Sequence, residues 1–193
     1  VKTTTKFAVV QSGTKVIALL GEAVHPDHPD LDLGGIAALL ASRFEARQAD
    51  IDKLIGRFAV VAAKGPAEVT LQTDAIGMRS VFYKVSGGRV VAGSHARLVA
   101  DAVGGAASAP QPKPFALGYP GLSTPYPGVL RLPPNSDLSL ISGRLKRFFP
   151  LEAVPAVTIE AAWDLAFTRA RQAVGAFVKR SPVLISLTAG LDS

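Results

Sequence analysis

Short apolar runs separated by glycine-containing turns fill much of the first hundred residues, and they restrict this region to paired antiparallel strands. The runs Phe7–Val10 and Val16–Leu20 flank a Gln-Ser-Gly-Thr segment that is typical of a hairpin turn. Two more hairpins are predicted from the same pattern, Arg57–Lys64 with Val69–Asp74 and Val81–Val85 with Val90–Gly93. An antiparallel sheet with short helices between its strands is therefore expected.

Three short helices are predicted among these strands. Apolar residues at three-to-four spacing outline the first of them, Ile36, Leu39, Leu40 and Phe44. Asp30 or Asp32, in a loop rich in proline and aspartate, is the expected N-cap of that helix. The second is expected at Asp50–Ile55, ended by Gly56, and the third at His95–Val103.

Residues 104–155 have a different texture, because most of the prolines of the chain fall there. We interpret them as an irregular inter-domain segment with one hairpin, formed by Asp137–Ile141 and Leu145–Phe149. Complete disorder is the alternative interpretation. Against it, Phe115, Tyr119 and Phe148 give the segment side chains that favour burial.

The clearest helix of the chain follows the proline-rich segment. Thr158 is a good N-cap, and an apolar stripe runs from Ile159 to Val178 and includes Trp163, which we expect in the core. A Ser-Pro pair at 181–182 ends the helix. Val183–Leu187 is then a short apolar run of the buried-strand type. A long helix that enters a buried strand is typical of the opening of an α/β domain, so a boundary is expected near Pro155.

Composition excludes several classes of protein. The absence of cysteine from the 193 residues excludes a disulfide scaffold, a thiolate metal site and a cysteine nucleophile within them. No apolar run approaches the roughly 18–20 residues of a membrane span, which predicts a soluble and by default cytoplasmic protein. The net charge of +6 is scattered, and its densest cluster is Arg144, Lys146 and Arg147. A nucleic-acid footprint requires a clustered basic face, so we predict no nucleic-acid partner.

The last seven residues carry the most chemistry. Leu187-Thr188-Ala189-Gly190-Leu191-Asp192-Ser193 follows the predicted strand, and a turn of small residues there exposes successive N–H groups to phosphate oxygens. The hydroxyls of Thr188 and Ser193 can donate to phosphate, and Asp192 can hold Mg²⁺. An ordinary strand-to-helix turn with a Ser/Asp cap is the alternative. The Walker pattern GxxxxGK[ST] is absent from the sequence.

This turn resembles the PP-loop, SGGxDS, of the ATP-pyrophosphatase superfamily, which cleaves ATP between its α- and β-phosphates and forms an adenylate. Gly190, Asp192 and Ser193 match that pattern, while Thr188 replaces its first Ser and Ala189 its first Gly. The resemblance implies ATP and Mg²⁺ as cofactors. It implies a nucleotide site that comprises Leu187, Thr188, Gly190, Asp192 and Ser193, with Asp192 as the metal ligand.

Further segments resemble the asparagine-synthetase family in the family's order. The stretch that ends at Tyr83, GRFAVVAA…LQTDAIGMRSVFY, is similar to G-x-F-A…(R/T)D-x-x-G-x-(K/R)-x-x-(Y/F)Y. Val90–Leu98 is similar to F-A-S-E-x-K-x-L, Tyr126–Asn135 to y-x-G-I-x-x-L-P-P-G, and Gly143–Pro150 to the following G…ryw-p. The TAGLDS turn lies where the second domain of that family begins.

The resemblance implies an α+β chain in three parts. Residues 1–103 would be an incomplete class II amidotransferase-like domain of Ntn-hydrolase fold, 104–155 the inter-domain segment, and 156–193 the first helix and strand of an α/β PP-loop domain. The implied activity is ATP-dependent activation of a carboxylate as acyl-AMP, with pyrophosphate release, followed by attack of ammonia or an amine. A homodimer is one expected assembly. We assign no catalytic residue within this chain and expect no turnover from it alone.

The chain departs from the glutamine-dependent members of the family. The glutamine-site motif N-G-E-x-Y-N maps on Leu20–His25, where Gly21 and Glu22 survive and both Asn positions are lost. The N-terminal Cys nucleophile of those members is missing, and Thr3, Thr4 and Thr5 have amide nitrogens rather than a free amine to act as base. Two explanations stay open. Either the chain lacks its true N-terminus, which we expect from the spacing, or the parent belongs to a Cys-less branch like the β-lactam synthetases and lasso-peptide cyclases.

Other candidate sites are less favoured by their residues. His25-Pro26-Asp27-His28-Pro29-Asp30 has residue types that bind metals, but prolines between the ligands are typical of a surface loop. Ser94 and His95 are neighbours in sequence, whereas a nucleophile and its base normally meet across the fold. Tyr126 and the pair Phe148-Phe149 are expected to pack between domains rather than stack on a ligand. A non-catalytic Ntn-like scaffold is the second functional hypothesis, motivated by the missing nucleophile.

Overall fold

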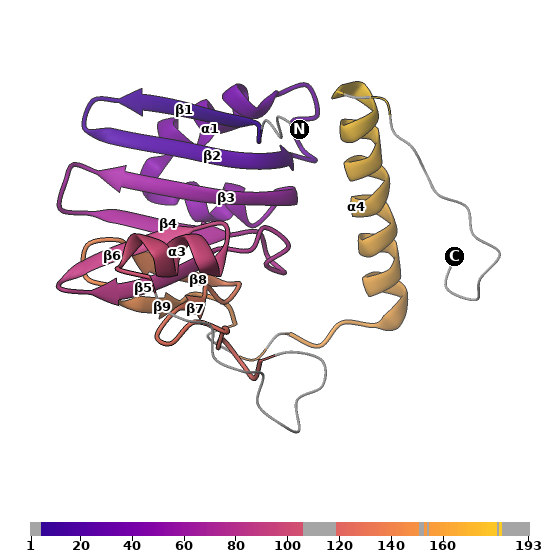
Figure 1. Cartoon of the computed structure of the whole chain (residues 1–193). Coiled ribbons are helices and arrows are strands. Elements are labelled where there is room, and N and C mark those ends of the chain that lie inside the picture. Colours follow the sequence, from indigo (N-terminus) through magenta and orange to yellow (C-terminus); the bar gives the residue numbers. More distant parts are fainter. Residues whose placement is uncertain (1–4, 106–118, 151–152, 154, 181, 183–193) are drawn as a thin grey trace.

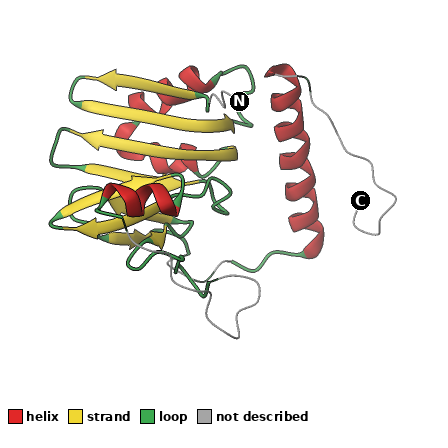
Figure 2. Ribbon diagram, viewed as in Figure 1, coloured by secondary structure: helices red, strands yellow, loops and turns green. Residues whose placement is uncertain are grey.

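A computed structural model describes residues 5–105, 119–150, 153, 155–180 and 182 of the chain. These residues form an α+β fold with two antiparallel sheets and four α-helices (Figures 1 and 2). The strands are β1 Phe7–Ser12, β2 Lys15–Val24, β3 Ile55–Lys64, β4 Val69–Thr73, β5 Phe82–Ser86, β6 Arg89–Gly93, β7 Leu130–Arg131, β8 Ser136–Ser139 and β9 Leu145–Arg147. The helices are α1 Leu33–Ser42, α2 Arg47–Ile51, α3 Ala96–Ala102 and α4 Ile159–Arg180, with a 3₁₀ turn at Phe44–Ala46.

The larger sheet has the strand order β1-β2-β3-β4-β8-β9, with antiparallel pairing throughout. All the predicted hairpins are present, with ends shifted by a few residues. The longest shift is in β2, which continues to Val24 rather than Leu20 because β3 pairs with it along its whole length. The strands of the proline-rich region are integral to the sheets, since β8 pairs with β4 and β7 pairs with β5.

Helices α1 and α2 cover one face of the larger sheet (Figure 2). Ile36 and Leu40 of α1 are fully buried against Ile17 and Leu19 of β2, in the largest core cluster. The predicted cap is confirmed, because Asp32 accepts a hydrogen bond of 2.7 Å from the N–H of Gly35. Such a cap satisfies one of the N–H groups that the first helical turn leaves free.

The predicted second helix was misplaced. Helix α2 ends at Ile51, and residues 55–56 already belong to β3. Gly56 has φ +146° inside that strand, where a β-carbon would lie 2.2 Å from the carbonyl oxygen of Glu22. A helix-ending glycine and a glycine at a close backbone approach both adopt positive φ, so the pattern alone did not separate the two roles.

The smaller sheet, in the order β6-β5-β7, packs on the opposite face of the larger one. Val81 and Tyr83 join Leu71 of β4 and Leu138 of β8 in a second core cluster. This sheet extends over β3, β4 and β8, and Figure 1 shows that it leaves the front of β1 and β2 uncovered. Helix α3 closes its outer side through Val99 and Ala100, and Tyr126 packs against that group.

Helix α4 lies across the ends of the strands (Figure 1). Its N-cap is confirmed, since Thr158 Oγ1 accepts a hydrogen bond of 3.2 Å from the N–H of Ala161. The prediction that Trp163 belongs to the core is wrong, because 71% of that residue is exposed. The helix docks through Ala173 and Ala176, which are buried, and turns most of its apolar stripe outward. Small side chains at the contact allow the helix backbone to approach the sheet closely.

The predicted strand Val183–Leu187 lies outside the described residues. Among the helices that are described, none combines the length and the apolar character that crossing a bilayer requires.

Candidate functional site

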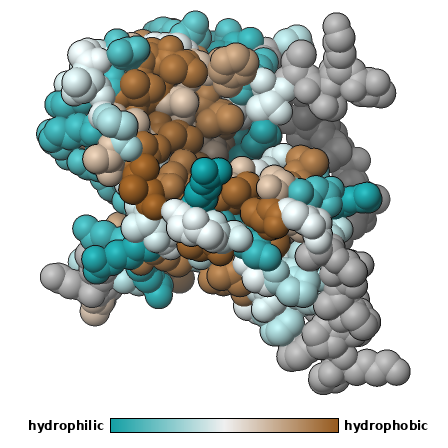
Figure 3. Space-filling view, turned by 60° about the vertical axis from the view of Figure 1, so that its left-hand side comes forward, coloured by the Kyte–Doolittle hydropathy of each residue, from teal (hydrophilic) through white to brown (hydrophobic). Residues whose placement is uncertain are grey.

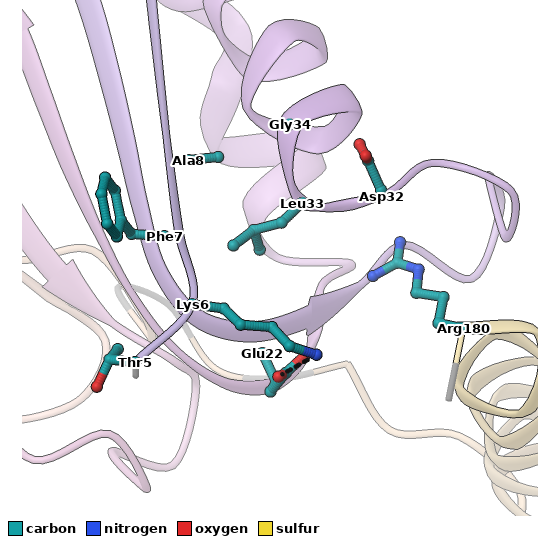
Figure 4. Close-up of a pocket in the computed structure, with 9 residues that line it drawn as sticks. All are labelled: Thr5, Lys6, Phe7, Ala8, Glu22, Asp32, Leu33, Gly34 and Arg180. Carbon is teal, nitrogen blue, oxygen red and sulfur yellow. Dashed lines mark ion pairs between the residues drawn. The ribbon is translucent and has the colours of Figure 1, made fainter. Parts of the chain in front are cut away.

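A cleft of about 760 Å³ opens at one end of β1 and β2 (Figure 4). The residues that line it come from the start of β1, the end of β2, the N-terminus of α1 and the C-terminus of α4. They are Thr5, Lys6, Phe7, Ala8, Glu22, Asp32, Leu33, Gly34 and Arg180. Two positive and two negative side chains thus face a single opening.

The charged groups of this cleft are mostly engaged with one another or with the backbone. Lys6 Nζ lies 2.8 Å from Glu22 Oε1, in an exposed ion pair. Asp32 caps α1, and Arg180 donates from Nη1 to the carbonyl oxygen of Ala23. The Nε and Nη2 atoms of Arg180 are buried and have no partner among the described atoms. Burial lowers the pKa of Arg180, against the opposing effect of the Asp32 and Glu22 carboxylates.

Gly21 and Glu22, the two residues that match the pattern N-G-E-x-Y-N, differ in their relation to this cleft, because Glu22 lines it and Gly21 does not. Gly21 has φ +107°, and a β-carbon on it would lie 2.2 Å from the carbonyl oxygen of Arg57. Only glycine fits such a backbone, so the presence of Gly21 follows from the close approach of the paired strands β2 and β3 at this point. Glu22 is the motif residue whose side chain lines the cleft.

Thr5, the hydroxyl residue among the described residues that line the cleft, is not arranged as a nucleophile. Thr5 Oγ1 accepts a hydrogen bond of 3.1 Å from Arg79 Nη2, and the nitrogen of Thr5 is a peptide amide. An N-terminal nucleophile needs a free α-amino group as its base. The described residues of this cleft therefore show no arrangement for attack on an amide.

A second cleft of about 500 Å³ lies on the other side of Glu22 and is more apolar. Phe177 of α4 faces Leu54, Ile76 and Met78 there, and Asp74 is at its edge. Asp74 is buried and accepts hydrogen bonds from the N–H groups of Met78 at 2.8 Å and Arg79 at 2.7 Å. Its carboxylate thus holds a turn, and both of its oxygens are engaged.

The 25–30 segment, predicted as a surface loop, contains a buried histidine. His25 is fully buried; its Nδ1 accepts a hydrogen bond of 3.2 Å from the N–H of Asp27, and its Nε2 lies 3.8 Å from Asp50 Oδ1. Burial is the main cause that lowers the pKa of His25. In the described residues no group of three His, Asp or Glu side chains has the spacing of a metal site. The apolar pattern of β2 up to Val24 was the signal that His25 would be carried inward.

The same loop fastens α4 to the domain. Asp27 Oδ1 lies 2.9 Å from Arg169 Nη1, and Asp27 Oδ2 lies 3.0 Å from Lys53 Nζ. These two cations lower the pKa of Asp27 to about 2. Lys179 Nζ adds a contact of 2.7 Å to Asp30 Oδ1. Sequence reasoning did not find these partners, because the two segments are far apart in the chain.

Two further candidates lie away from these clefts or outside the described residues. Ser94 Oγ lies 2.9 Å from His95 Nδ1 on an exposed turn, and neither residue lines either cleft. The predicted nucleotide site, with its metal ligand Asp192, falls outside the described residues. No protein-family model matches the chain, and no curated protein matches it.

Proposed function

We propose that this chain belongs to an ATP-dependent amide-bond-forming enzyme of the asparagine-synthetase type, and that its sheet domain is an Ntn-like amidotransferase domain without glutaminase activity. In the proposed reaction a substrate carboxylate oxygen attacks the α-phosphorus of ATP, and pyrophosphate leaves. The nitrogen of ammonia or an amine then attacks the acyl-AMP carbonyl, and AMP leaves. In this proposal Thr188, Gly190, Asp192 and Ser193 would hold the pyrophosphate end of ATP, and Asp192 would hold its Mg²⁺.

The backbone conformation of Asn135 is the observation that supports the proposal most. Asn135 occupies the last position of the segment similar to L-P-P-G, and its φ is +57°. Positive φ favours glycine, and asparagine is among the few other residues that tolerate it. Among the described residues, Asn135 is the one non-glycine residue with positive φ. Asn135, which stands where the pattern has its last glycine, thus keeps the positive φ that a glycine would adopt there.

Contacts between the family-like segments add support. Arg131, in the segment that ends at Asn135, donates from Nη2 to the carbonyl oxygen of Gly77 at 2.9 Å. Gly77 lies in the turn that Asp74 holds, and its N–H donates to the Asp74 carbonyl oxygen at 2.9 Å. Patterns that match by accident have no reason to meet in the fold. Here two of them, 54 residues apart, form one structural unit.

Loss of glutaminase activity is part of the proposal. It is supported by the engaged hydroxyl of Thr5 and by the ion pair that Lys6 makes with Glu22. The non-catalytic scaffold is the second candidate function, and the same observations favour it. Only the adenylating step separates the two.

Pyrophosphate release tests the proposal. The complete gene product is incubated with ATP, Mg²⁺ and a panel of carboxylates, and pyrophosphate is measured with and without each acid. We expect release that depends on one class of acid and is abolished by Asp192→Ala, with no glutamate formed from glutamine. Failure of every acid to stimulate release would refute the synthetase and leave the scaffold. Glutamate formation would instead refute the loss of glutaminase activity.

A further inference from the structure

A gap of about 240 Å³ separates the larger sheet from the smaller one. The register of β2, β3 and β4 places their members of its lining on the face that the smaller sheet covers. Ala92 of β6 faces them from the other side, because it stands beside the buried Tyr83 in the register. The larger apolar part of the lining is Leu20, Ala59, Val61, Leu71, Val81 and Leu140. The gap is therefore built from both sheets and is mostly apolar.

The gap opens beside further apolar surface. Phe7 of β1 stands next to Leu20 in the register and is 71% exposed. Figure 3 shows apolar surface gathered over the upper part of the molecule, at the height where β1 to β3 lie in Figure 1. Pockets that bind small molecules are mostly apolar, with a few polar groups that fix the orientation of the ligand. An apolar ligand that enters this gap would remove both its own surface and that of the lining from water.

A guanidinium group supplies the polar part of the site. Arg79 lines the gap together with Ser80 and Ser94, and its Nη2 donates to Thr5 Oγ1 at 3.1 Å. Within the described part of the chain no carboxylate forms an ion pair with this guanidinium, and Asp74 accepts from the backbone N–H of Arg79 instead. A guanidinium has five N–H donors, and the bond to Thr5 uses one of them. Its planar fork matches a carboxylate, which accepts two parallel hydrogen bonds.

The size and the lining of the gap restrict the ligand further. Each water molecule takes about 30 Å³ in the liquid, so the gap corresponds to about eight water volumes. That volume suits a molecule of about eight to ten non-hydrogen atoms, which is one ring or a short chain with its carboxylate. Glutamine and other polar amino acids would have to leave ammonium or amide groups unpaired against the apolar lining. The gap therefore fits a monocarboxylate with an apolar body.

We propose that the gap between the two sheets is a binding site for small apolar monocarboxylic acids, aromatic or short-chain. The apolar body lies between Val61 and Ala92, and the carboxylate pairs with Arg79. The site is independent of the adenylating reaction, because the gap lies within the sheet domain and the ATP turn is assigned to residues 188–193. It gives the sheet domain a ligand of its own, whether the parent protein is a synthetase or a scaffold.

An NMR titration of the full chain with benzoate, without ATP, tests the proposal. We expect shifts of the methyl groups of Leu20, Val61 and Leu71 that saturate with a Kd on the order of 1 mM, as for other ligands of this size. Benzyl alcohol has the same ring without the charge. It should bind about tenfold more weakly, because hydrogen bonds to a charged group are the stronger ones. Glutamine should leave these methyl groups unchanged.

Three variants separate the charge from the apolar gap. Arg79→Gln should weaken benzoate binding by about tenfold and leave benzyl alcohol binding unchanged. Arg89→Gln is the matched control, because it removes the same charge from an exposed position of β6 that does not line the gap. Ala92→Leu should abolish binding of both probes, since Ala92 is exposed and a larger side chain there fills the gap. Circular dichroism checks that each variant folds.

Several results would overturn the proposal. One is the absence of saturable shifts at the methyl groups of Leu20, Val61 and Leu71. Another is an equal affinity of the parent chain for benzoate and benzyl alcohol, a comparison that needs no variant. Benzoate binding that Arg79→Gln weakens no more than Arg89→Gln does, or that survives Ala92→Leu, would also contradict it. Shifts confined to Ile76 and Met78 would place the acid in the second cleft instead.

Discussion

Gly21→Ala is the substitution for which the structure gives the sharpest expectation. The new methyl group would lie 2.2 Å from the carbonyl oxygen of Arg57, a backbone atom that cannot move without shifting β3. The residue would also keep φ near +107°, which costs an L-residue about 1–3 kcal/mol. Forcing the strands apart adds about 1–3 kcal/mol, as overpacking of a core does. We expect a total loss of about 2–6 kcal/mol from the free energy of unfolding.

Gly13→Ala is the matched control. Gly13 has φ +61° at the tip of the β1–β2 hairpin, and a β-carbon added there would have no atom within 4 Å of it. Both substitutions reduce the entropy of the unfolded chain by the same amount, so that effect cancels in the comparison. The difference between the two variants therefore reports the clash with Arg57 together with the larger backbone strain at φ +107°.

Urea unfolding followed by far-UV circular dichroism measures that difference. For a chain of this size each kcal/mol shifts the midpoint temperature by about 2–4 °C, so Gly21→Ala should also lower it by roughly 4–24 °C. Tryptophan fluorescence would report on α4, which holds Trp163, rather than on the sheet. Equal losses of stability in Gly21→Ala and Gly13→Ala would refute the argument that the pairing of β2 with β3 requires glycine at position 21.

Three further outcomes follow from the same contacts. Burial lowers the pKa of His25 in the folded chain below its ordinary value of 6.5, so the unfolded chain binds the proton more readily. The contribution of His25 to stability should be complete above pH 6.5 and should fall as the pH drops below it. A urea midpoint that depends on pH just as strongly in His25→Gln would contradict this. Arg169→Ala should raise the pKa of Asp27 and speed amide exchange in α4. It should lower the free energy of unfolding by less than about 1 kcal/mol, because the ion pair is partly exposed. Unchanged exchange would refute the role of this pair in fastening α4. Asp74→Ala should lower the free energy of unfolding by about 2–4 kcal/mol, because it leaves the N–H groups of Met78 and Arg79 unpaired. Asp74→Asn should have a stability between those of Asp74→Ala and the parent chain. Equal unfolding midpoints for both variants and the parent would contradict the role of Asp74 in holding this turn.

The hairpins could be predicted from sequence because turn chemistry and strand patterning agree locally. Gly13 between two apolar runs defines β1 and β2 without reference to the rest of the chain. The cap at Asp32 was predictable for the same reason. The position of α2 could not be predicted in this way. Gly56 does not end a helix but lies in β3, close to the backbone of β2, and that contact comes from another part of the chain.

The side through which α4 docks could not be predicted from its own pattern. An apolar stripe predicts that a helix packs against something, but not which of its sides meets the rest of the domain. Here Ala173 and Ala176 make the contact, and charged residues fasten it through the 25–30 loop. Trp163 was therefore assigned to the core by a rule that holds only when the stripe is the docking side. His25 is the converse case, since local prolines predicted exposure and the length of β2 decided burial.

The residues at the positions compared with the pattern N-G-E-x-Y-N bear on the proposed loss of glutaminase activity. Gly21 survives at a position that the backbone requires. The two Asn positions are occupied by Leu20, which lines the gap between the sheets, and by His25, which is fully buried. Neither Leu20 nor His25 lines the first cleft, which Glu22 lines. A domain that still needed to bind glutamine would have to keep polar groups at those positions and accept the cost of desolvating them. The position of Leu20 in the gap between the sheets and the burial of His25 are consistent with the proposal that this domain has no glutaminase activity.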